Sequence, residues 1–93
     1  LTSFLGITGA AWQGNLDSVR RFQSNGVSIN AVDPRSFTAL HYAAAGGHSD
    51  LVSHLLDSEA EFNYQDKYGR TSLFWAAYHG QKEIVELLVE HGA

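Results

Sequence analysis

A chain of 93 residues that is 44% hydrophobic and 17% charged has the composition of a globular domain, which excludes a disordered tail or a collagen-like rod. Its net charge is −4 and its six basic residues are scattered apart from Arg20-Arg21, so no cationic stripe is present to neutralise nucleic-acid phosphates. No apolar run approaches the roughly 20 residues that a bilayer crossing needs. We therefore expect no nucleic-acid partner and no membrane insertion.

The first third of the chain is the faintest version of a pattern that recurs further along. Ala10-Ala11 and Gly14 return at the same spacing in the middle of the sequence, so we expect residues 1–33 to form a first unit of a repeated structure. At two positions this unit differs from the later ones. It has Leu5-Gly6-Ile7-Thr8 where they have a motif that begins with threonine, and Gln23 where a leucine packs the helix. A terminal unit with one solvated face would show such changes.

The middle and the end of the chain are two copies of one phrase, 33 residues apart. Thr38-Ala39-Leu40-His41-Tyr42-Ala43-Ala44 returns as Thr71-Ser72-Leu73-Phe74-Trp75-Ala76-Ala77, and eight of the 23 aligned pairs from residue 38 onward are identical. A fixed period of this length is typical of stacked units that share one continuous core.

One unit is clearest from residue 66 onward. Gly69 supplies the backbone freedom of a tight turn, and Thr71 can accept a backbone N–H at the start of the next helix. Beyond it, two apolar sets at helical spacing are separated by a break at Gly80. Their members are Leu73, Ala76 and Ala77 before the break and Ile84, Val85 and Leu88 after it. We therefore predict two short antiparallel helices, with small residues against the neighbouring unit and branched residues filling the space behind.

These residues resemble the ankyrin repeats, whose unit is a finger-like turn, a helix pair and a connecting loop. The most specific similarities are Thr38-Ala39-Leu40-His41, the Ala-Ala pairs, the closing phrase 87–93, and Asn63 placed three residues before Asp66. The resemblance implies an all-α solenoid of stacked antiparallel helix pairs joined by β-hairpin-like finger loops.

The same resemblance implies how the chain is organised. It gives one domain over residues 1–93, with repeats at 1–33, 34–66 and 67–93, the first an N-terminal cap and the third truncated before its finger loop. We expect a monomer or part of a longer ankyrin array, in the cytoplasm or nucleus, which the absence of cysteine also favours.

The middle unit departs from the family pattern at three positions. Ser36 stands where the turn glycine belongs and Pro34 follows Asp33, so we expect this finger to be stiffer than the one at Gly69 and differently bent. Glu59 replaces the glycine that ends the second helix in the other units. A non-glycine residue in a left-handed conformation there is strained by roughly 1 kcal/mol.

The third unit ends at Ala93 without a polar capping helix. We expect this ending to leave three apolar side chains of the unit partly uncovered, those of Leu73, Ile84 and Leu88. It also indicates that the chain is cut from a longer array.

Five histidines raise the question of a metal or catalytic site. The resemblance gives His41 a structural role, tying its helix to the adjacent finger, and His48 at the helix-helix turn a similar one. His54, His79 and His91 show no i, i+4 pairing of the kind used by helical zinc sites. No residue sits on a nucleophile elbow or beside a phosphate loop, so we expect no enzyme activity, no metal and no cofactor.

Asn63 has two interpretations. The residues before it, Leu55 and Glu61-Phe62, resemble the context of asparagine hydroxylation in ankyrin repeats, which makes Asn63 a candidate modification site. The alternative is structural, because asparagine at this position commonly satisfies backbone groups between units.

The resemblance also maps a concave surface, built from the fingers and the exposed sides of the first helices, onto the sequence. Aromatic side chains and arginine are the usual anchors of protein interfaces, and they are frequent at these positions. The expected partner-binding residues are Trp12, Arg35, Phe37, Tyr42, Lys67, Tyr68, Arg70, Trp75, Tyr78 and His79, with Phe4 extending the surface into the first unit. Tyr42 and Trp75 have an equally good alternative, since both replace a half-exposed leucine and can pack within the stack.

Three functions are compatible with these observations. The leading hypothesis is a non-enzymatic module that binds a protein or peptide partner on the concave surface. An alternative is a structural spacer or an intramolecular regulatory segment of a larger multidomain protein. A third possibility is part of an enzyme or channel whose activity lies outside this chain.

Overall fold

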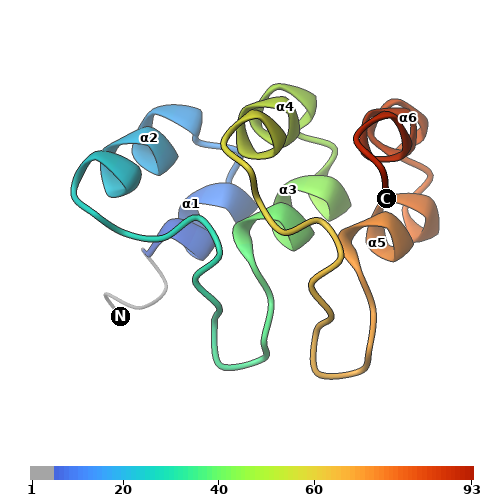
Figure 1. The fold of residues 1–93 in the computed structure, drawn as a ribbon, viewed down its shortest axis with the longest axis horizontal. Coiled ribbons are helices and arrows are strands. Elements are labelled where there is room, and N and C mark those ends of the chain that lie inside the picture. Colours follow the sequence, from blue (N-terminus) through green and yellow to red (C-terminus); the bar gives the residue numbers. More distant parts are fainter. Residues whose placement is uncertain (1–5) are drawn as a thin grey trace.

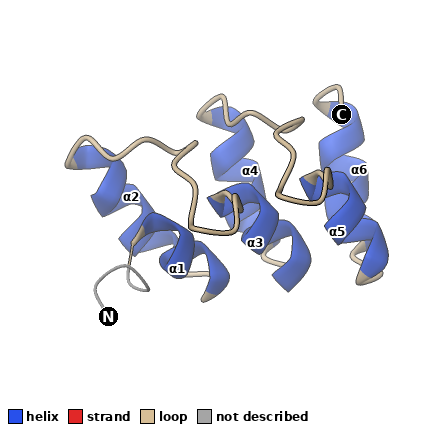
Figure 2. Cartoon of the chain, turned by 90° about the horizontal axis from the view of Figure 1, so that it is seen from below, coloured by secondary structure: helices blue, strands red, loops and turns tan. Residues whose placement is uncertain are grey.

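The computed structural model describes residues 6–93, which form three helix pairs stacked in a row (Figure 1). The helices are α1 (Ile7–Trp12), α2 (Leu16–Ser24), α3 (Ala39–Gly46), α4 (Ser49–Asp57), α5 (Ser72–Tyr78) and α6 (Lys82–Glu90). The inner helices α1, α3 and α5 form one layer and the outer helices α2, α4 and α6 form the other (Figure 2). The predicted all-α stack of helix pairs is confirmed.

Two long loops, the fingers, join α2 to α3 and α4 to α5 and extend away from the outer layer (Figure 1). Within residues 6–93, β pairing is confined to one antiparallel bridge, between Val32 and Thr38 at the base of the first finger. Thr38 and Thr71 then cap the inner helices that follow. The hydroxyl of Thr38 accepts from the N–H of His41 at 3.3 Å, and that of Thr71 accepts from the N–H of Phe74 at 3.5 Å.

The core lies between the layers and has the predicted division of residue sizes. Small residues of the inner helices, such as Ala11, Ala43 and Ala76, are fully buried, and so are branched side chains of the outer helices such as Ile84 and Leu88. Two of these correct an expectation, because Ile84 and Leu88 are 1% and 0% exposed. They are covered because α6 packs against α4 as well as against α5.

The two fingers turn in the same way, which corrects the expectation of a different bend. Ser36 has φ 64° and Gly69 has φ 78°, and each donates its N–H over 2.9 Å to an aspartate carbonyl three residues earlier, Asp33 or Asp66. A serine takes the left-handed conformation here because the aspartate holds the turn together. The other left-handed prediction is confirmed, since Glu59 has φ 67°.

A side chain after each inter-helix turn reaches back to the previous repeat. The Nε2 of His48 donates to the carbonyl of Trp12 at 3.2 Å, and the side-chain amide of Gln81 donates to the carbonyl of Ala45 at 3.2 Å. Both side chains lie so close to a glycine of the preceding turn that a Cβ on Gly14 or Gly47 would collide with them. The structural role predicted for His48 is confirmed, and Gln81 fills the same place one period later.

Candidate functional site

Each finger is organised by one aspartate. Oδ1 of Asp66, a buried residue, accepts the N–H groups of Tyr68 at 2.8 Å and Arg70 at 2.9 Å, and its Oδ2 accepts from the indole Nε1 of Trp75 at 3.0 Å. The finger backbone and the first aromatic side chain of α5 are therefore fixed to one carboxylate.

Asp33 repeats this arrangement one period earlier. Its Oδ1 accepts the N–H groups of Arg35 and Phe37, both at 2.9 Å, and its Oδ2 accepts from the hydroxyl of Tyr42. Tyr42 and Trp75 are thus both half-buried, and the polar atom of each is bound to the aspartate of the finger that precedes its helix.

These contacts shift the pKa values of Asp66 and Tyr42. Burial by itself raises the pKa of Asp66, but the hydrogen bonds from Arg70, Trp75 and Tyr68 outweigh it and the net pKa is lowered. Burial, together with the hydrogen bond to Asp33 and its charge, raises the pKa of the Tyr42 phenol. The Asp66 carboxylate is therefore an ionised acceptor and the Tyr42 phenol is a neutral donor.

His41 connects the two fingers. Its Nε2 lies 3.0 Å from the carbonyl of Arg70, which can only accept, so Nε2 carries the proton and Nδ1 accepts the N–H of Thr38 at 3.1 Å. Burial lowers the pKa of His41 despite the opposing Arg70 hydrogen bond and the charges of Asp66 and Asp33. The neutral imidazole thus ties α3 to the next finger, as its position predicts.

An aromatic cluster covers the inner-helix side of the last two repeats. Phe37 contacts Tyr42 and Trp75, with ring centroids 5.3 and 5.8 Å apart. Trp75 in turn contacts Tyr78 at 6.0 Å and stacks with His79 at 6.1 Å. The rings thus run without interruption from the first finger to the end of α5.

Arg70 joins this cluster to the second finger. Its guanidinium carbon lies 5.3 Å from the ring centroid of Tyr68, 5.1 Å from that of Phe74 and 5.4 Å from that of Trp75. Lys67 lies over the Tyr68 ring at 5.7 Å. Cation–π contacts of this kind hold two flexible basic side chains beside exposed rings.

A family model described as ankyrin repeats, in three copies, matches residues 7–93. The chain belongs to the ankyrin repeat family. No curated protein matches the chain significantly. Ankyrin repeats are in general protein–protein interaction modules, and the family is generally non-enzymatic.

We use the term finger face for the surface that the ankyrin fingers share with the exposed sides of α3 and α5. Its residues are Arg35, Phe37, Tyr42, Lys67, Tyr68, Arg70, Phe74, Trp75, Tyr78 and His79. Nine of these are expected from the sequence, and the structure brings all but Arg35 into one network of ring contacts.

Sequence reasoning missed Phe74. It is 41% exposed and contacts Trp75 and Tyr78 at ring-centroid distances of 5.3 and 5.9 Å. The signal was available, because Phe74 stands at the repeat position of the buried, hydrogen-bonded His41. The following finger covers His41 through Tyr64 and the carbonyl of Arg70, whereas the described residues contain no finger after α6 that would cover Phe74.

Trp12 is not part of the network. It ends α1, is 64% exposed, and takes part in none of the ring contacts found among residues 6–93. Phe4, which would extend the surface into the first repeat, lies outside the described residues.

The remaining polar candidates make structural contacts or lie in open loops. His54 contacts Gln23 at 2.6 Å between outer helices. Asn30 accepts the N–H of Glu61 at 2.9 Å between repeats, whereas Asn63, one period later, is exposed. Among the described residues, no group of three or more histidine or acidic side chains could hold a metal ion.

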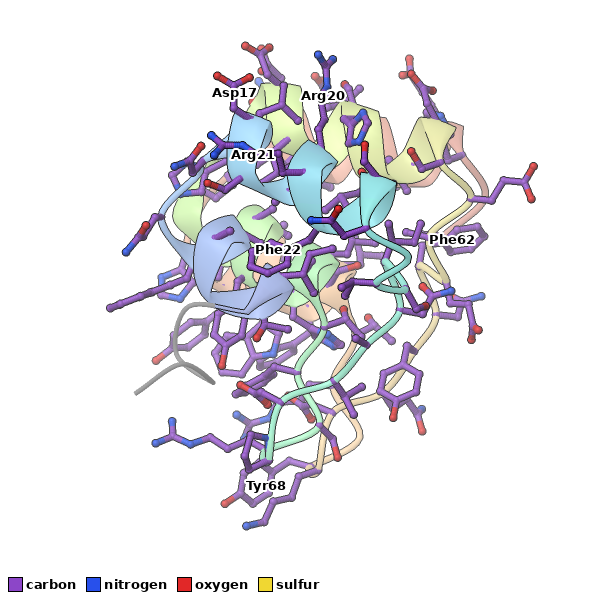
Figure 3. The ribbon with its side chains drawn as sticks, turned by 90° about the vertical axis from the view of Figure 1, so that its left-hand side faces the viewer. Asp17, Arg20, Arg21, Phe22, Phe62 and Tyr68 are labelled. Atoms are coloured by element: carbon purple, nitrogen blue, oxygen red, sulfur yellow. The ribbon has the colours of Figure 1, made fainter. Side chains whose placement is uncertain are left out.

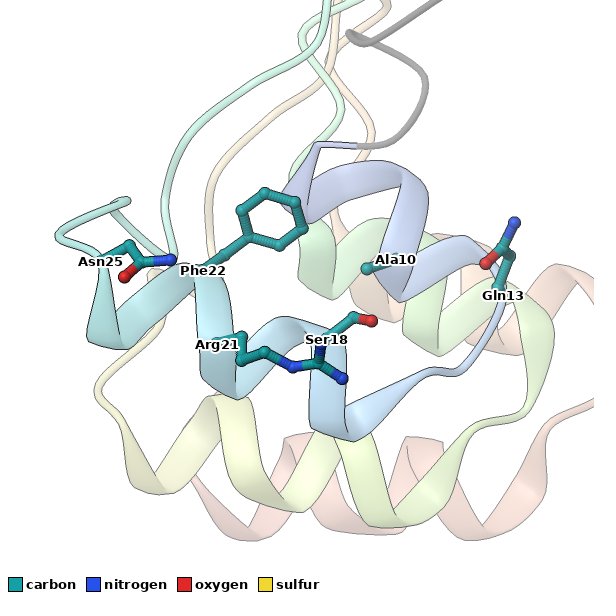
Figure 4. A pocket seen from close by; sticks show the side chains of 6 residues that line it. All are labelled: Ala10, Gln13, Ser18, Arg21, Phe22 and Asn25. Atoms are coloured by element: carbon teal, nitrogen blue, oxygen red, sulfur yellow. The ribbon is translucent and has the colours of Figure 1, made fainter.

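The hollows of the surface offer little chemistry. One of about 310 Å³ lies between α1 and α2 (Figure 4), and its lining residues are Ala10, Gln13, Ser18, Arg21, Phe22 and Asn25. None of these six is a histidine or an acid that could act as a general base. Along residues 6–93, every helix is too short to cross a bilayer.

Proposed function

We propose that this ankyrin-repeat chain is a non-enzymatic module that binds a protein or peptide partner on the finger face. The observation that carries the proposal is the exposure of three large rings in one repeat, with Tyr68, Phe74 and Tyr78 at 68%, 41% and 71%. Grouped aromatic side chains on the surface of a folded chain are typical of binding sites, since they bury large areas with few rotatable bonds.

The support extends to the half-buried residues of the face. Phe37, Tyr42 and Trp75 are held by ring contacts and, for the last two, by hydrogen bonds to the finger aspartates. A partner would therefore meet rings whose conformations are already fixed, which reduces the entropy lost on binding. Trp12 would contribute, if at all, through a separate contact at the other end of the stack.

The test is capture of partners from a cell lysate with the native chain and two matched variants. Tyr68→Ala/Tyr78→Ala removes exposed rings from the finger face, whereas Val89→Ala trims a side chain that is 55% exposed on the outer helix α6. Circular dichroism establishes that both variants keep their helicity. We expect specific partners to bind the native chain and the Val89 variant and to be lost from the double variant.

A partner retained equally by all three proteins would contradict binding at the finger face. Capture of background proteins alone would favour the alternative, in which the repeats act as a spacer or intramolecular regulatory segment. In that case the same substitutions should matter only when neighbouring domains are attached.

We also propose Asn63 as a candidate for asparagine hydroxylation. Its exposure in the loop between α4 and α5 supports access by an enzyme, while Asn30, at the same repeat position, is engaged by the N–H of Glu61. Peptide mass spectrometry of the chain isolated from its native cells would detect one added oxygen atom on Asn63. An unmodified peptide in cells that contain such a hydroxylase would contradict the proposal.

A further inference from the structure

Charge is divided between the two sides of the molecule. The outer helices, with residues 58–61 at the start of the loop after α4, carry eight of the ten acidic residues and three of the six basic ones. The turns of the two fingers, residues 33–37 and 66–70, carry the other three basic residues and two acidic ones, and the inner helices carry no Asp, Glu, Lys or Arg. Figure 3 shows the outer end, with Asp17 and two arginines, opposite the finger end, with Tyr68.

The two finger acids are less accessible than the finger cations and are outnumbered by them. Asp33 and Asp66 each accept three hydrogen bonds from the finger and inner helix that follow them, and Asp66 is only 5% exposed. Arg35, Lys67 and Arg70 are all exposed. The charge that the fingers present to a partner is therefore positive, although the chain as a whole is acidic.

The finger cations also lack an internal counter-ion. Within residues 6–93, no Lys or Arg side chain lies within 4.0 Å of a carboxylate oxygen, and the one contact of that kind joins His91 of the α6 C-terminus to Asp57 of α4 at 3.9 Å. Arg70 is held over three rings instead. Within residues 6–93 the hydrogen bonds of Arg70 use its main chain alone, so its guanidinium donors are available to a carboxylate in a bidentate pair.

We propose that the occupant of the finger face is an acidic peptide segment that combines Asp or Glu with aromatic or large aliphatic side chains. This inference rests on the proposed function and adds the chemistry of the partner. The carboxylates would pair with Arg70, Lys67 and Arg35, and the apolar side chains would pack on Tyr68, Phe74 and Tyr78.

The same features argue against a nucleic acid as the occupant. Three cations neutralise few phosphates, and the acidic outer layer repels a polyanion that extends beyond the fingers. An acidic peptide needs only a few carboxylates and gains the remaining affinity from apolar contact with the rings.

The test starts from a random twelve-residue peptide library displayed on phage and selected on the immobilised chain. Enriched peptides are then synthesised and their dissociation constants measured by fluorescence anisotropy with the native chain. Two triple variants with equal change in net charge are compared, each checked by circular dichroism. Arg35→Glu/Lys67→Glu/Arg70→Glu reverses the finger cations, and the matched control Arg20→Glu/Arg21→Glu/Lys82→Glu reverses the outer ones.

We expect enriched peptides to be acidic and to contain aromatic or aliphatic residues. The finger reversal should raise the dissociation constants of these peptides by about tenfold or more, and the outer reversal should raise them by less than about threefold. Binding to the native chain should also weaken as the salt concentration rises. Because reversal at Arg70 also removes its ring contacts, Arg70→Gln in an otherwise native chain provides a second measurement and should weaken binding by about threefold to tenfold.

Other outcomes separate the inference from the proposed function. Enrichment of neutral or basic peptides that do not bind the Tyr68→Ala/Tyr78→Ala variant would overturn the inference of an acidic partner. It would still support the finger face as the binding site. Peptides insensitive to every finger variant would overturn both. Equal or tighter binding of a single-stranded DNA twelve-mer would identify a nucleic acid, and not a peptide, as the occupant. A dimer in analytical ultracentrifugation that dissociates in the finger-reversal variant would identify the acidic outer layer of a second copy as the occupant.

Discussion

Replacing His41 by alanine should lower the free energy of unfolding by about 2–4 kcal/mol. The side chain is 2% exposed, and its two nitrogens hold the N–H of Thr38 and the carbonyl of Arg70. Thr38 is 3% exposed, so its N–H would be left buried without a partner, which costs about 1–3 kcal/mol. The carbonyl of the exposed Arg70 can recruit water, so its loss adds about 1 kcal/mol.

Urea unfolding followed by circular dichroism measures this difference. His54→Ala is the matched control, because it removes a half-buried imidazole whose partner, the side chain of Gln23, can be resolvated, and it should cost less than about 1 kcal/mol. Equal effects of the two substitutions, or a loss below about 0.5 kcal/mol for His41→Ala, would refute the argument from buried hydrogen bonds.

The same pair of proteins tests the charge of His41. Because its pKa in the folded chain lies below the ordinary value of 6.5, the unfolded chain binds the proton more tightly. The stabilising contribution of neutral His41 is therefore complete above pH 6.5. It declines as the pH falls below 6.5 toward the pKa of His41 in the folded chain. The stability gap between native chain and His41→Ala should narrow from about pH 7.5 to about pH 5.5, and a constant gap would contradict a neutral buried imidazole.

Four further substitutions test the backbone and the core. Glu59→Gly should raise stability by about 0.5–1 kcal/mol in urea unfolding, since it relieves a left-handed residue; a loss would contradict strain there. Gly69→Ala should cost about 1 kcal/mol for the same conformational reason, whereas Gly47→Ala should cost about twice that, because its Cβ would displace Gln81. Leu40→Ala should cost about 2–5 kcal/mol and speed amide exchange in α1 and α5 together with α3, whereas exchange confined to α3 would contradict coupling between repeats.

The sequence predicts the fold well because the features that determine it are periodic. Identical residues at one spacing indicate the same local structure, so the helix pairs and the threonine caps follow directly, and the left-handed conformation of Glu59 follows from its place at the position of Gly26 and Gly92. The prediction of a different bend at Ser36 is wrong because it rests on the residue types at Ser36 and Pro34 and leaves out Asp33, whose carboxylate accepts the hydrogen bonds that set the turn. Capping of the turn by a side chain outweighs the preference of its fourth residue.

The candidate site is less predictable because it arises where the repeats differ. Tyr42 and Trp75 could be assigned to packing or to binding from sequence alone, and only the hydrogen bonds to Asp33 and Asp66 show how firmly each is held. The position of the Arg70 guanidinium among three rings depends on side-chain conformation, which no sequence pattern specifies. The binding role of these residues remains a prediction for the experiments above.

The backward contacts of His48 and Gln81 have a consequence for how such a chain can change over time. Both side chains donate to a main-chain carbonyl, and every residue has a carbonyl whatever its side chain. The joint between neighbours therefore requires a donor on one side and, on the other, a turn glycine that leaves room for it, but no particular side chain at the carbonyl. Units with unrelated surfaces can be duplicated, exchanged or engineered into a new order while the joints survive, which leaves the aromatic and charged positions free to diverge.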